Sequence, residues 1–132
     1  SASLNEKFIS AAQKEISLSK LSNRQDIQLH FAIMEVEAWL LGMNRLPMLI
    51  ETSLTAEDIK ERLKIDMSQD PETSFYHPAV VLSNIFNLGE KSYDKHKNEI
   101  EKILSQLMRE DFEQLYCSGK CQSFKQFMDA IV

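Results

Sequence analysis

Hydrophobic and polar residues alternate over the segment Ile27–Ile33, and the spacing of the apolar positions then changes. Within this segment every second residue is apolar, a period of two that is typical of a strand. From Glu35 onward the apolar residues follow helical spacing, in the order Val36, Trp39, Leu40 and Met43. The pattern therefore predicts a strand that runs directly into a buried helix.

The other apolar stripes have helical spacing and predict an α-rich α+β fold, with six or seven helices packed around the one clear strand, Ile27–Ile33. The expected helices cover 4–21, the Trp39 segment, 56–63 after Thr55, 78–88, the stretch from Ser92 or Asp94 to Leu107, the Phe112 segment up to Gly119, and the segment capped by Ser123. Residues 64–78 lack a clean period and are expected to form a loop. The predicted core is Phe8, Ile16, Leu29, Phe31, Val36, Trp39, Leu40, Leu82, Ile85, Ile103, Leu107, Phe112, Phe124 and Phe127.

Length and composition indicate a single domain that spans residues 1–132. The 43% of hydrophobic residues is ordinary for a globular protein, and only three Gly and three Pro leave little material for the turns of a many-stranded fold. One strand cannot form a sheet alone. We therefore expect either an upstream sheet, with this chain as the C-terminal part of a longer protein, or a homodimer partner.

Charge and cysteine usage indicate which partners and which cellular location to expect. The formal net charge is -5, which does not favour nucleic acid as a partner. Binding to nucleic acid remains possible only through a locally basic face. No apolar run approaches the roughly 20 residues of a membrane span, and we expect no membrane contact. Two Cys, six Met and no export signal favour a cytoplasmic location.

Glu35 and Glu37 are the first candidates for chemistry, because they stand where the expected strand meets the helix. On an extended chain both carboxylates would point to the same side and could hold one Mg²⁺ together with water or phosphate oxygens. On a helix they would lie about 200° apart and could not share an ion. The competing interpretation is that acids in the first turn of a helix stabilise the positive end of its dipole, and spacing alone favours this second interpretation.

Three further groups of residues have weaker signals. Tyr93 lies among lysines that include Lys95 and could contact phosphate, although interleaved acids make a solvated helix face the default. Cys117 and Cys121 form a C-x₃-C pair with no second pair nearby, which favours two free thiols over zinc or redox chemistry. His77 follows several acids in the 64–78 loop, but the spacing matches no metal-ligand pattern.

Several short motifs together resemble the C-terminal half of an uncharacterised bacterial Toprim-like family. The segments that carry the resemblance are FAIMEVEAWLLG at 31–42, DPE at 70–72, HPAVVL at 77–82, Tyr93 with Lys95, and SF at 123–124. In that family a strand leads into an E-x-E-A-W helix, followed by a Pro-bearing loop, a Y-x-K element and a terminal S-F helix. The resemblance implies that the chain is part of a larger Toprim-like α/β fold.

Toprim domains use a Glu and an Asp-x-Asp pair to bind Mg²⁺ for phosphodiester chemistry, and the matched region lies downstream of those residues. The resemblance makes Glu35 and Glu37 the catalytic and metal-binding candidates, with Tyr93 and Lys95 as phosphate contacts. It implies the C-terminal portion of a Mg²⁺-dependent nuclease or phosphotransferase in bacterial defence, inactive without upstream residues. The sequence departs from the family at 42–44, where an Asp is expected soon after the Trp helix. The alternative is a non-catalytic helical interaction or scaffold domain.

Overall fold

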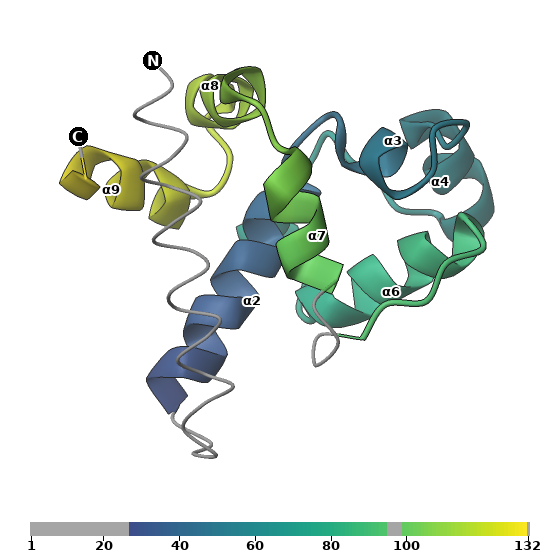
Figure 1. Cartoon of the computed structure of the whole chain (residues 1–132), viewed down its shortest axis with the longest axis horizontal. Helices are drawn as coiled ribbons and strands as arrows, with labels where there is room; N and C mark the ends of the chain where they lie inside the picture. Colours follow the sequence, from purple (N-terminus) through teal and green to yellow (C-terminus); the bar gives the residue numbers. More distant parts are fainter. Residues whose placement is uncertain (1–26, 95–98, 132) are drawn as a thin grey trace.

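The computed structural model describes residues 27–94 and 99–131, and these residues form helices joined by short connections (Figure 1). The helices are α2 (Ile27–Leu41), α3 (Leu46–Ile50), α4 (Ala56–Leu63), α5 (Pro71–Ser74), α6 (Pro78–Leu88), α7 (Glu99–Gln106), α8 (Arg109–Ser118) and α9 (Gln122–Ile131). No strand occurs in this described part of the chain. The fold is therefore helical over the described residues.

The prediction of a strand at Ile27–Ile33 is wrong, because this segment is the first half of helix α2. The alternation is incomplete, because Ala32 and Met34 are apolar where a strand pattern would have polar residues. Both are also good helix formers. The segment contains no Gly or Pro and joins directly to the strongly helical residues that follow, so a helix can propagate through it cooperatively. The expected α+β class and the expected place in a larger α/β fold both depended on this strand. Both predictions are therefore wrong for the described residues, which are helical.

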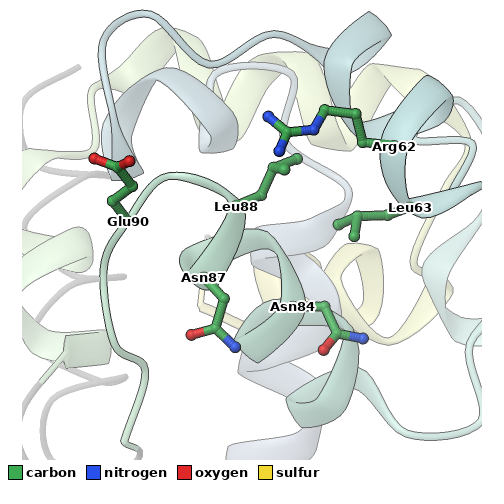
Figure 2. A pocket seen from close by; sticks show the side chains of 6 residues that line it. All are labelled: Arg62, Leu63, Asn84, Asn87, Leu88 and Glu90. Carbon is green, nitrogen blue, oxygen red and sulfur yellow. The ribbon is translucent and has the colours of Figure 1, made fainter.

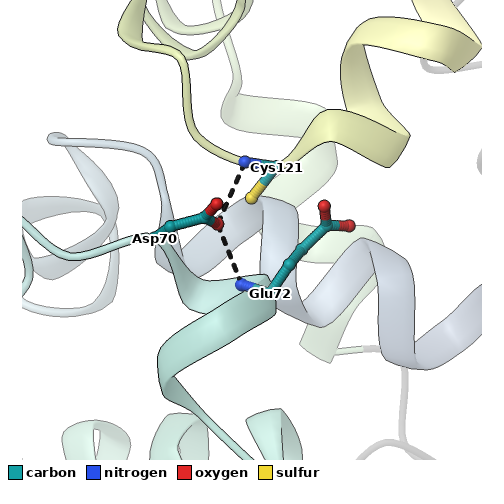
Figure 3. A group of neighbouring side chains, drawn as sticks. All are labelled: Asp70, Glu72 and Cys121. Atoms are coloured by element: carbon teal, nitrogen blue, oxygen red, sulfur yellow. Dashed lines mark hydrogen bonds between the residues drawn. The ribbon is translucent and has the colours of Figure 1, made fainter.

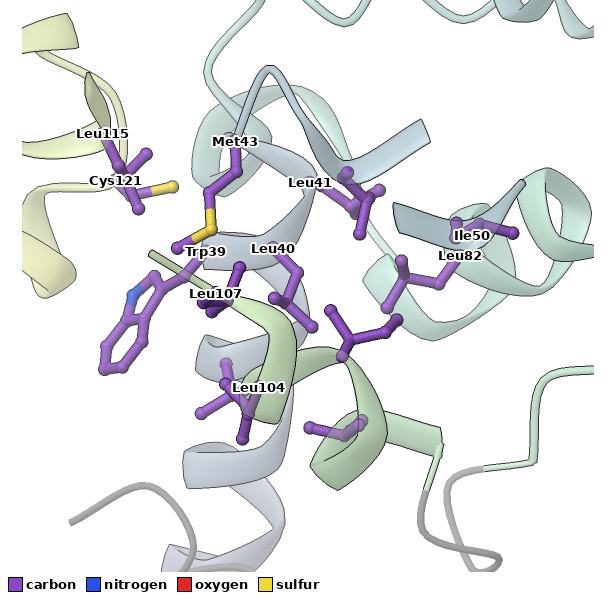
Figure 4. Close-up of a cluster of buried hydrophobic side chains, with 14 of the residues drawn as sticks. Trp39, Leu40, Leu41, Met43, Ile50, Leu82, Leu104, Leu107, Leu115 and Cys121 are labelled. Carbon is purple, nitrogen blue, oxygen red and sulfur yellow. The ribbon is translucent and has the colours of Figure 1, made fainter. Parts of the chain in front are cut away.

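Helix α2 is the element around which the other described helices are arranged. Figure 1 shows α8 and α9 on one side of it and α3, α4 and α6 on the other, with α7 in front in this view. Helices α5, α6 and α9 pack directly against α2, whereas α4 packs on α6 and α3 on α7. The core runs along α2, where Leu40 and Leu41 meet side chains from the surrounding helices (Figure 4). A helix surrounded in this way must be apolar on most of its faces, as α2 is.

Most of the predicted core is confirmed. The buried members are Val36, Trp39, Leu40, Leu82, Ile85, Ile103, Leu107, Phe112 and Phe124, and Phe127 is partly buried against the same cluster. The predicted helix at 4–21, with Phe8 and Ile16, lies outside the described residues, as do the side chains of Leu29 and Phe31.

Local signals placed several helices correctly. Thr55 caps α4 as expected, since its side chain accepts a hydrogen bond from the Asp58 amide at 3.1 Å, and the Asp58 carboxylate accepts one from the Thr55 amide at 3.2 Å. Helix α6 begins at Pro78 and ends before Gly89 as predicted. Helix α8 ends before Gly119, whose φ of 79° is left-handed, a conformation that glycine adopts without strain.

Three other predictions need revision or lie outside the described residues. The expected loop at 64–78 contains the one-turn helix α5, and Asp70 caps it by accepting a hydrogen bond from the Glu72 amide. Ser123 does not cap α9 from outside but lies in its first turn. The helix expected to start at Ser92 or Asp94 is described as α7 only from Glu99; Ser92 and Asp94 themselves are not helical, and residues 95–98 lie outside the described residues.

Among the described helices, none combines the length and the apolar character needed to cross a membrane.

Candidate functional site

Glu37 is fully buried on α2 and is held by an aromatic hydroxyl from a distant segment. The Tyr93 hydroxyl donates a hydrogen bond of 2.6 Å to the Glu37 carboxylate. The Tyr93 ring packs against the ring of Phe86, with 5.1 Å between centroids. Burial, followed by the nearby charge of Glu37, raises the pKa of the Tyr93 hydroxyl well above its ordinary value, so this group stays protonated and acts as a donor.

Glu35 lies on a different side of α2 and is exposed. Partial burial of its carboxyl group, and then the nearby negative charge of Glu72, raise the pKa of Glu35 above its ordinary value. Residues two apart on a helix are separated by about 200° around its axis. Within α2, Glu35 and Glu37 are therefore not brought together, and the structure does not form the shared ion site expected from an extended chain.

Glu72, on α5, is the carboxylate that the fold does bring near Glu35. Its two oxygens face Ser123 of α9: the Ser123 amide donates a hydrogen bond of 3.1 Å, and the Ser123 hydroxyl donates a second bond to the same carboxylate. The Ser123 hydroxyl oxygen in turn accepts a bond of 2.7 Å from the indole N–H of Trp39. Three helices, α2, α5 and α9, therefore meet at one chain of hydrogen bonds.

Asp70 forms the second contact between α5 and the start of α9. Its carboxylate accepts hydrogen bonds from the amides of Cys121, at 3.1 Å, and Glu72, at 3.0 Å (Figure 3). The Cys121 thiol is buried and donates toward the carbonyl oxygen of Ala38, at 3.6 Å. Burial, and then the charges of Glu72 and Asp70, raise the pKa of this thiol to about 12, so it remains protonated at neutral pH.

Ligand atoms of Asp70, Glu72 and Cys121 lie within 4.8 Å of one another, close enough to suggest a metal site. The hydrogen bonds argue for a structural role instead. One Asp70 oxygen already accepts two amide hydrogens, and the Cys121 thiol donates to the Ala38 carbonyl oxygen, so both groups have partners within the fold. A hard cation such as Mg²⁺ would instead use carboxylate oxygens, which Glu72 and Glu35 both offer, and the charge of Glu72 is felt at the Glu35 carboxyl, whose pKa it helps to raise.

No family model, curated protein or solved structure matches this chain. The resemblance to a Toprim-like family therefore stays a prediction, and an argument about function has to rest on the geometry of the described residues.

The other residues singled out in the sequence lie in different environments. Tyr93 lies against Glu37, whereas Lys95 lies outside the described residues. Cys117 is an exposed free thiol, unlike the buried Cys121. His77 is exposed, and its imidazole stacks edge-on against the ring of Tyr76 at 4.7 Å.

A shallow groove of about 390 Å³ lies between α4 and α6. It is lined by Arg62, Leu63, Asn84, Asn87, Leu88 and Glu90. In Figure 2 the guanidinium of Arg62 and the amides of Asn84 and Asn87 do not converge on one point. A binding site normally combines an apolar cavity with a few convergent polar groups, so this groove is not the candidate site.

Sequence reasoning missed the partnership of Glu72 with Ser123 and with Glu35. Asp70-Pro71 carried a local signal, because an acid followed by proline is typical of an N-cap and the first helical residue. Nothing local could show that α5 would lie against the start of α9, because the partners are 51 residues apart. The E-x-E-A-W, DPE and SF segments do meet in the described structure, at this one cluster.

Replacing Tyr93 by phenylalanine is expected to lower the free energy of unfolding by about 1–3 kcal/mol, because it removes a hydrogen bond to a buried carboxylate. Urea denaturation followed by far-UV circular dichroism would measure the loss. Tyr76→Phe is the matched control, because the Tyr76 side chain is 89% exposed. Equal stabilities of the two variants would contradict a structural role for the Tyr93–Glu37 bond.

Proposed function

We propose that this chain is the helical portion of a Mg²⁺-dependent enzyme that acts on phosphodiesters, as a nuclease or phosphotransferase, and that Glu35 and Glu72 are the carboxylates it contributes to the metal centre. The observation that carries the proposal is the proximity of Glu35 and Glu72, which come from separate helices and lie close enough for Glu72 to raise the pKa of Glu35. Two carboxylates that repel one another are stabilised by a divalent cation between them.

The chemistry of the two groups suits Mg²⁺. This ion prefers oxygen ligands, and it commonly binds through one or two carboxylates while the remaining positions are filled by water and substrate phosphates. The Glu72 carboxylate is oriented by the amide and hydroxyl of Ser123, and Ser123 is itself oriented by the indole of Trp39. Such outer contacts hold a ligand in place and support its affinity for metal.

Glu37 has a different role in this proposal. Its carboxylate is fully buried and bonded to Tyr93, so it anchors the segment after α6 to α2. The proposal thus assigns the metal to Glu35 alone of the two acids in the E-x-E segment. The remaining metal ligands would come from the upstream residues that the family resemblance implies, and the chain alone is not expected to cleave nucleic acid.

Calorimetric titration with Mg²⁺ and with Mn²⁺ tests the proposal on the full chain. We expect saturable heat of binding with the unmodified protein and its loss in Glu35→Gln, which keeps the shape of the side chain but removes the charge. Glu61→Gln is the matched control, because Glu61 is an exposed acid on α4 and its substitution is expected to leave the binding isotherm unchanged.

Absence of binding by the folded, unmodified chain would reject the metal-binding proposal as it applies to this chain. It would favour the alternative function, a non-catalytic helical interaction domain. One observation already supports that alternative: the carboxylates of Glu37, Asp70 and Asp111 are each bonded to groups within the fold. Equal binding by the unmodified chain and Glu35→Gln would place the cation elsewhere.

A further inference from the structure

Ser123 bonds to both oxygens of the Glu72 carboxylate. Its backbone amide donates a hydrogen bond of 3.1 Å to Oε1 of Glu72, and its hydroxyl donates to Oε2. One residue of α9 therefore supplies two donors to a carboxylate that lies 51 residues away in the sequence. The contact holds the carboxylate at two points, so it fixes the orientation of the group as well as its position.

The place of these two donors decides which part of the carboxylate stays open. An ionised carboxylate has about four lone-pair sites, two on each oxygen. The amide nitrogen and the hydroxyl oxygen of a serine are only three bonds apart, so a serine that bonds to both carboxylate oxygens lies across the edge that joins them. We call this the chelating edge, because a cation bound by both oxygens would occupy it. With Ser123 across this edge, Glu72 can offer a cation only one oxygen, through a lone pair directed away from Ser123.

Trp39 sets the direction of the Ser123 hydroxyl. The indole N–H donates a bond of 2.7 Å to the hydroxyl oxygen. Because an indole N–H can only donate and an ionised carboxylate can only accept, the hydroxyl between them accepts from Trp39 and donates to Glu72. The indole is itself fixed in the core, with a side chain that is 4% exposed and a ring 5.4 Å from that of Phe124. The hydroxyl hydrogen is therefore directed at Glu72.

Glu35 lies on the same side of α2 as Trp39. Residues four apart on a helix are neighbours on its surface, with about 5–6 Å between their Cβ atoms. Partial burial, and then the charge of Glu72, raise the pKa of Glu35. Both carboxylates of the proposed metal centre therefore stand beside the contact between Trp39 and Ser123.

We infer that Ser123 is a specificity-determining residue of the proposed metal centre, which selects Mg²⁺ over Ca²⁺ by closing the chelating edge of Glu72. Mg²⁺ takes oxygen ligands in a nearly ideal octahedron at about 2.0–2.1 Å, whereas Ca²⁺ takes about six to eight oxygens at about 2.3–2.6 Å and often binds both oxygens of a carboxylate. A carboxylate limited to one oxygen suits the smaller ion and removes a binding mode of the larger one. The inference rests on the proposed function, because it needs Glu72 to bind a cation.

The ratio of the dissociation constants for Ca²⁺ and Mg²⁺ tests the inference, measured by calorimetric titration of the full chain with each ion separately. The unmodified chain is expected to bind Mg²⁺ more tightly than Ca²⁺. Ser123→Ala keeps the amide donor and removes the hydroxyl, which frees Oε2 of Glu72. We expect the preference for Mg²⁺ to fall by about tenfold, the effect of one charge-assisted hydrogen bond that no longer competes with the larger ion.

Two further variants separate this effect from a general loss of stability. Ser123→Thr keeps both donors and is expected to retain the preference of the unmodified chain. Ser105→Ala is the matched control, because the exposed Ser105 hydroxyl donates to the Lys102 carbonyl oxygen within α7, and we expect no change in the ratio. Both ions are titrated into the same protein, so a lower stability alone would not alter their ratio.

The outcomes distinguish failure of this inference from failure of the proposed function. Absence of binding of either ion by the unmodified chain would reject the proposed function and this inference with it. Binding of Mg²⁺ together with an equal or tighter binding of Ca²⁺ would overturn the inference alone, and this comparison needs no substitution. An unchanged ratio in Ser123→Ala would also overturn it and leave the proposed metal centre standing.

Discussion

Replacing Leu82 by alanine is expected to lower the free energy of unfolding by about 3 kcal/mol. Leu82 is completely buried on α6, near Leu41 of α2 and Ile50 of α3 in the cluster drawn in Figure 4. Truncation would remove apolar contacts and leave a cavity that the surrounding helices can fill only in part. Urea denaturation of the full chain, followed by far-UV circular dichroism, would measure the change.

Val80 provides the control for this prediction on the same helix. Its side chain is 56% exposed, and Val80→Ala should change stability by less than about 0.5 kcal/mol. A loss of similar size in both variants would indicate that α6 does not present Leu82 to α2 as described. A small loss in Leu82→Ala together with an unchanged Val80→Ala would indicate a core loose enough to close around the missing side chain.

Asp111→Ala is expected to lower the free energy of unfolding by about 3 kcal/mol. The Asp111 carboxylate, with a side chain only 2% exposed, contacts the Arg45 guanidinium at 2.7 Å and accepts a hydrogen bond from the Met108 amide at 2.8 Å. It thus joins the segment after α2 to the beginning of α8. Its removal would leave the half-buried Arg45 charge without this partner and the first turn of α8 without its cap.

Glu113→Ala tests whether burial or contact distance sets this energy. The Arg109–Glu113 pair on α8 is just as short, at 2.6 Å, but its side chains are 54% and 52% exposed. Because exposed pairs contribute little, we expect Glu113→Ala to change stability by less than about 0.5 kcal/mol. The same urea experiment on both variants provides the measurement, and losses of equal size would contradict a special contribution from the buried pair.

The failure at Ile27–Ile33 shows the limit of reading a short apolar pattern. Seven residues can satisfy a period of two by chance, and a short apolar run can belong to a strand or to a buried helix. The helix expected from Glu35 onward in fact begins at Ile27. The predicted strand and the predicted helix therefore form one helix, α2. Longer and better-capped segments did not have this ambiguity, as α4 and α6 show.

Sequence patterns pointed to Glu35 but not to Glu72, the carboxylate whose charge reaches it in the structure. Glu35 and Glu37 were expected to act together, but the helix places Glu37 against Tyr93 in the interior and leaves Glu35 exposed. The partner that Glu35 has in the structure, Glu72, lies in what was expected to be a loop.

The sequence by itself determined the helical character of most segments, their caps and most of the buried side chains. These features depend on interactions within a few residues: the Thr55–Asp58 capping box, proline at the start of α6 and glycine after α8 are examples. Only the tertiary structure decided that α5 would lie against the first turn of α9 and bring Glu72 to Ser123 and Glu35. That arrangement follows from the packing of apolar helix faces along α2. Because the hydrophobic effect has no direction, the apolar pattern shows which faces are buried but not which distant polar groups, such as Glu72 and Ser123, will meet.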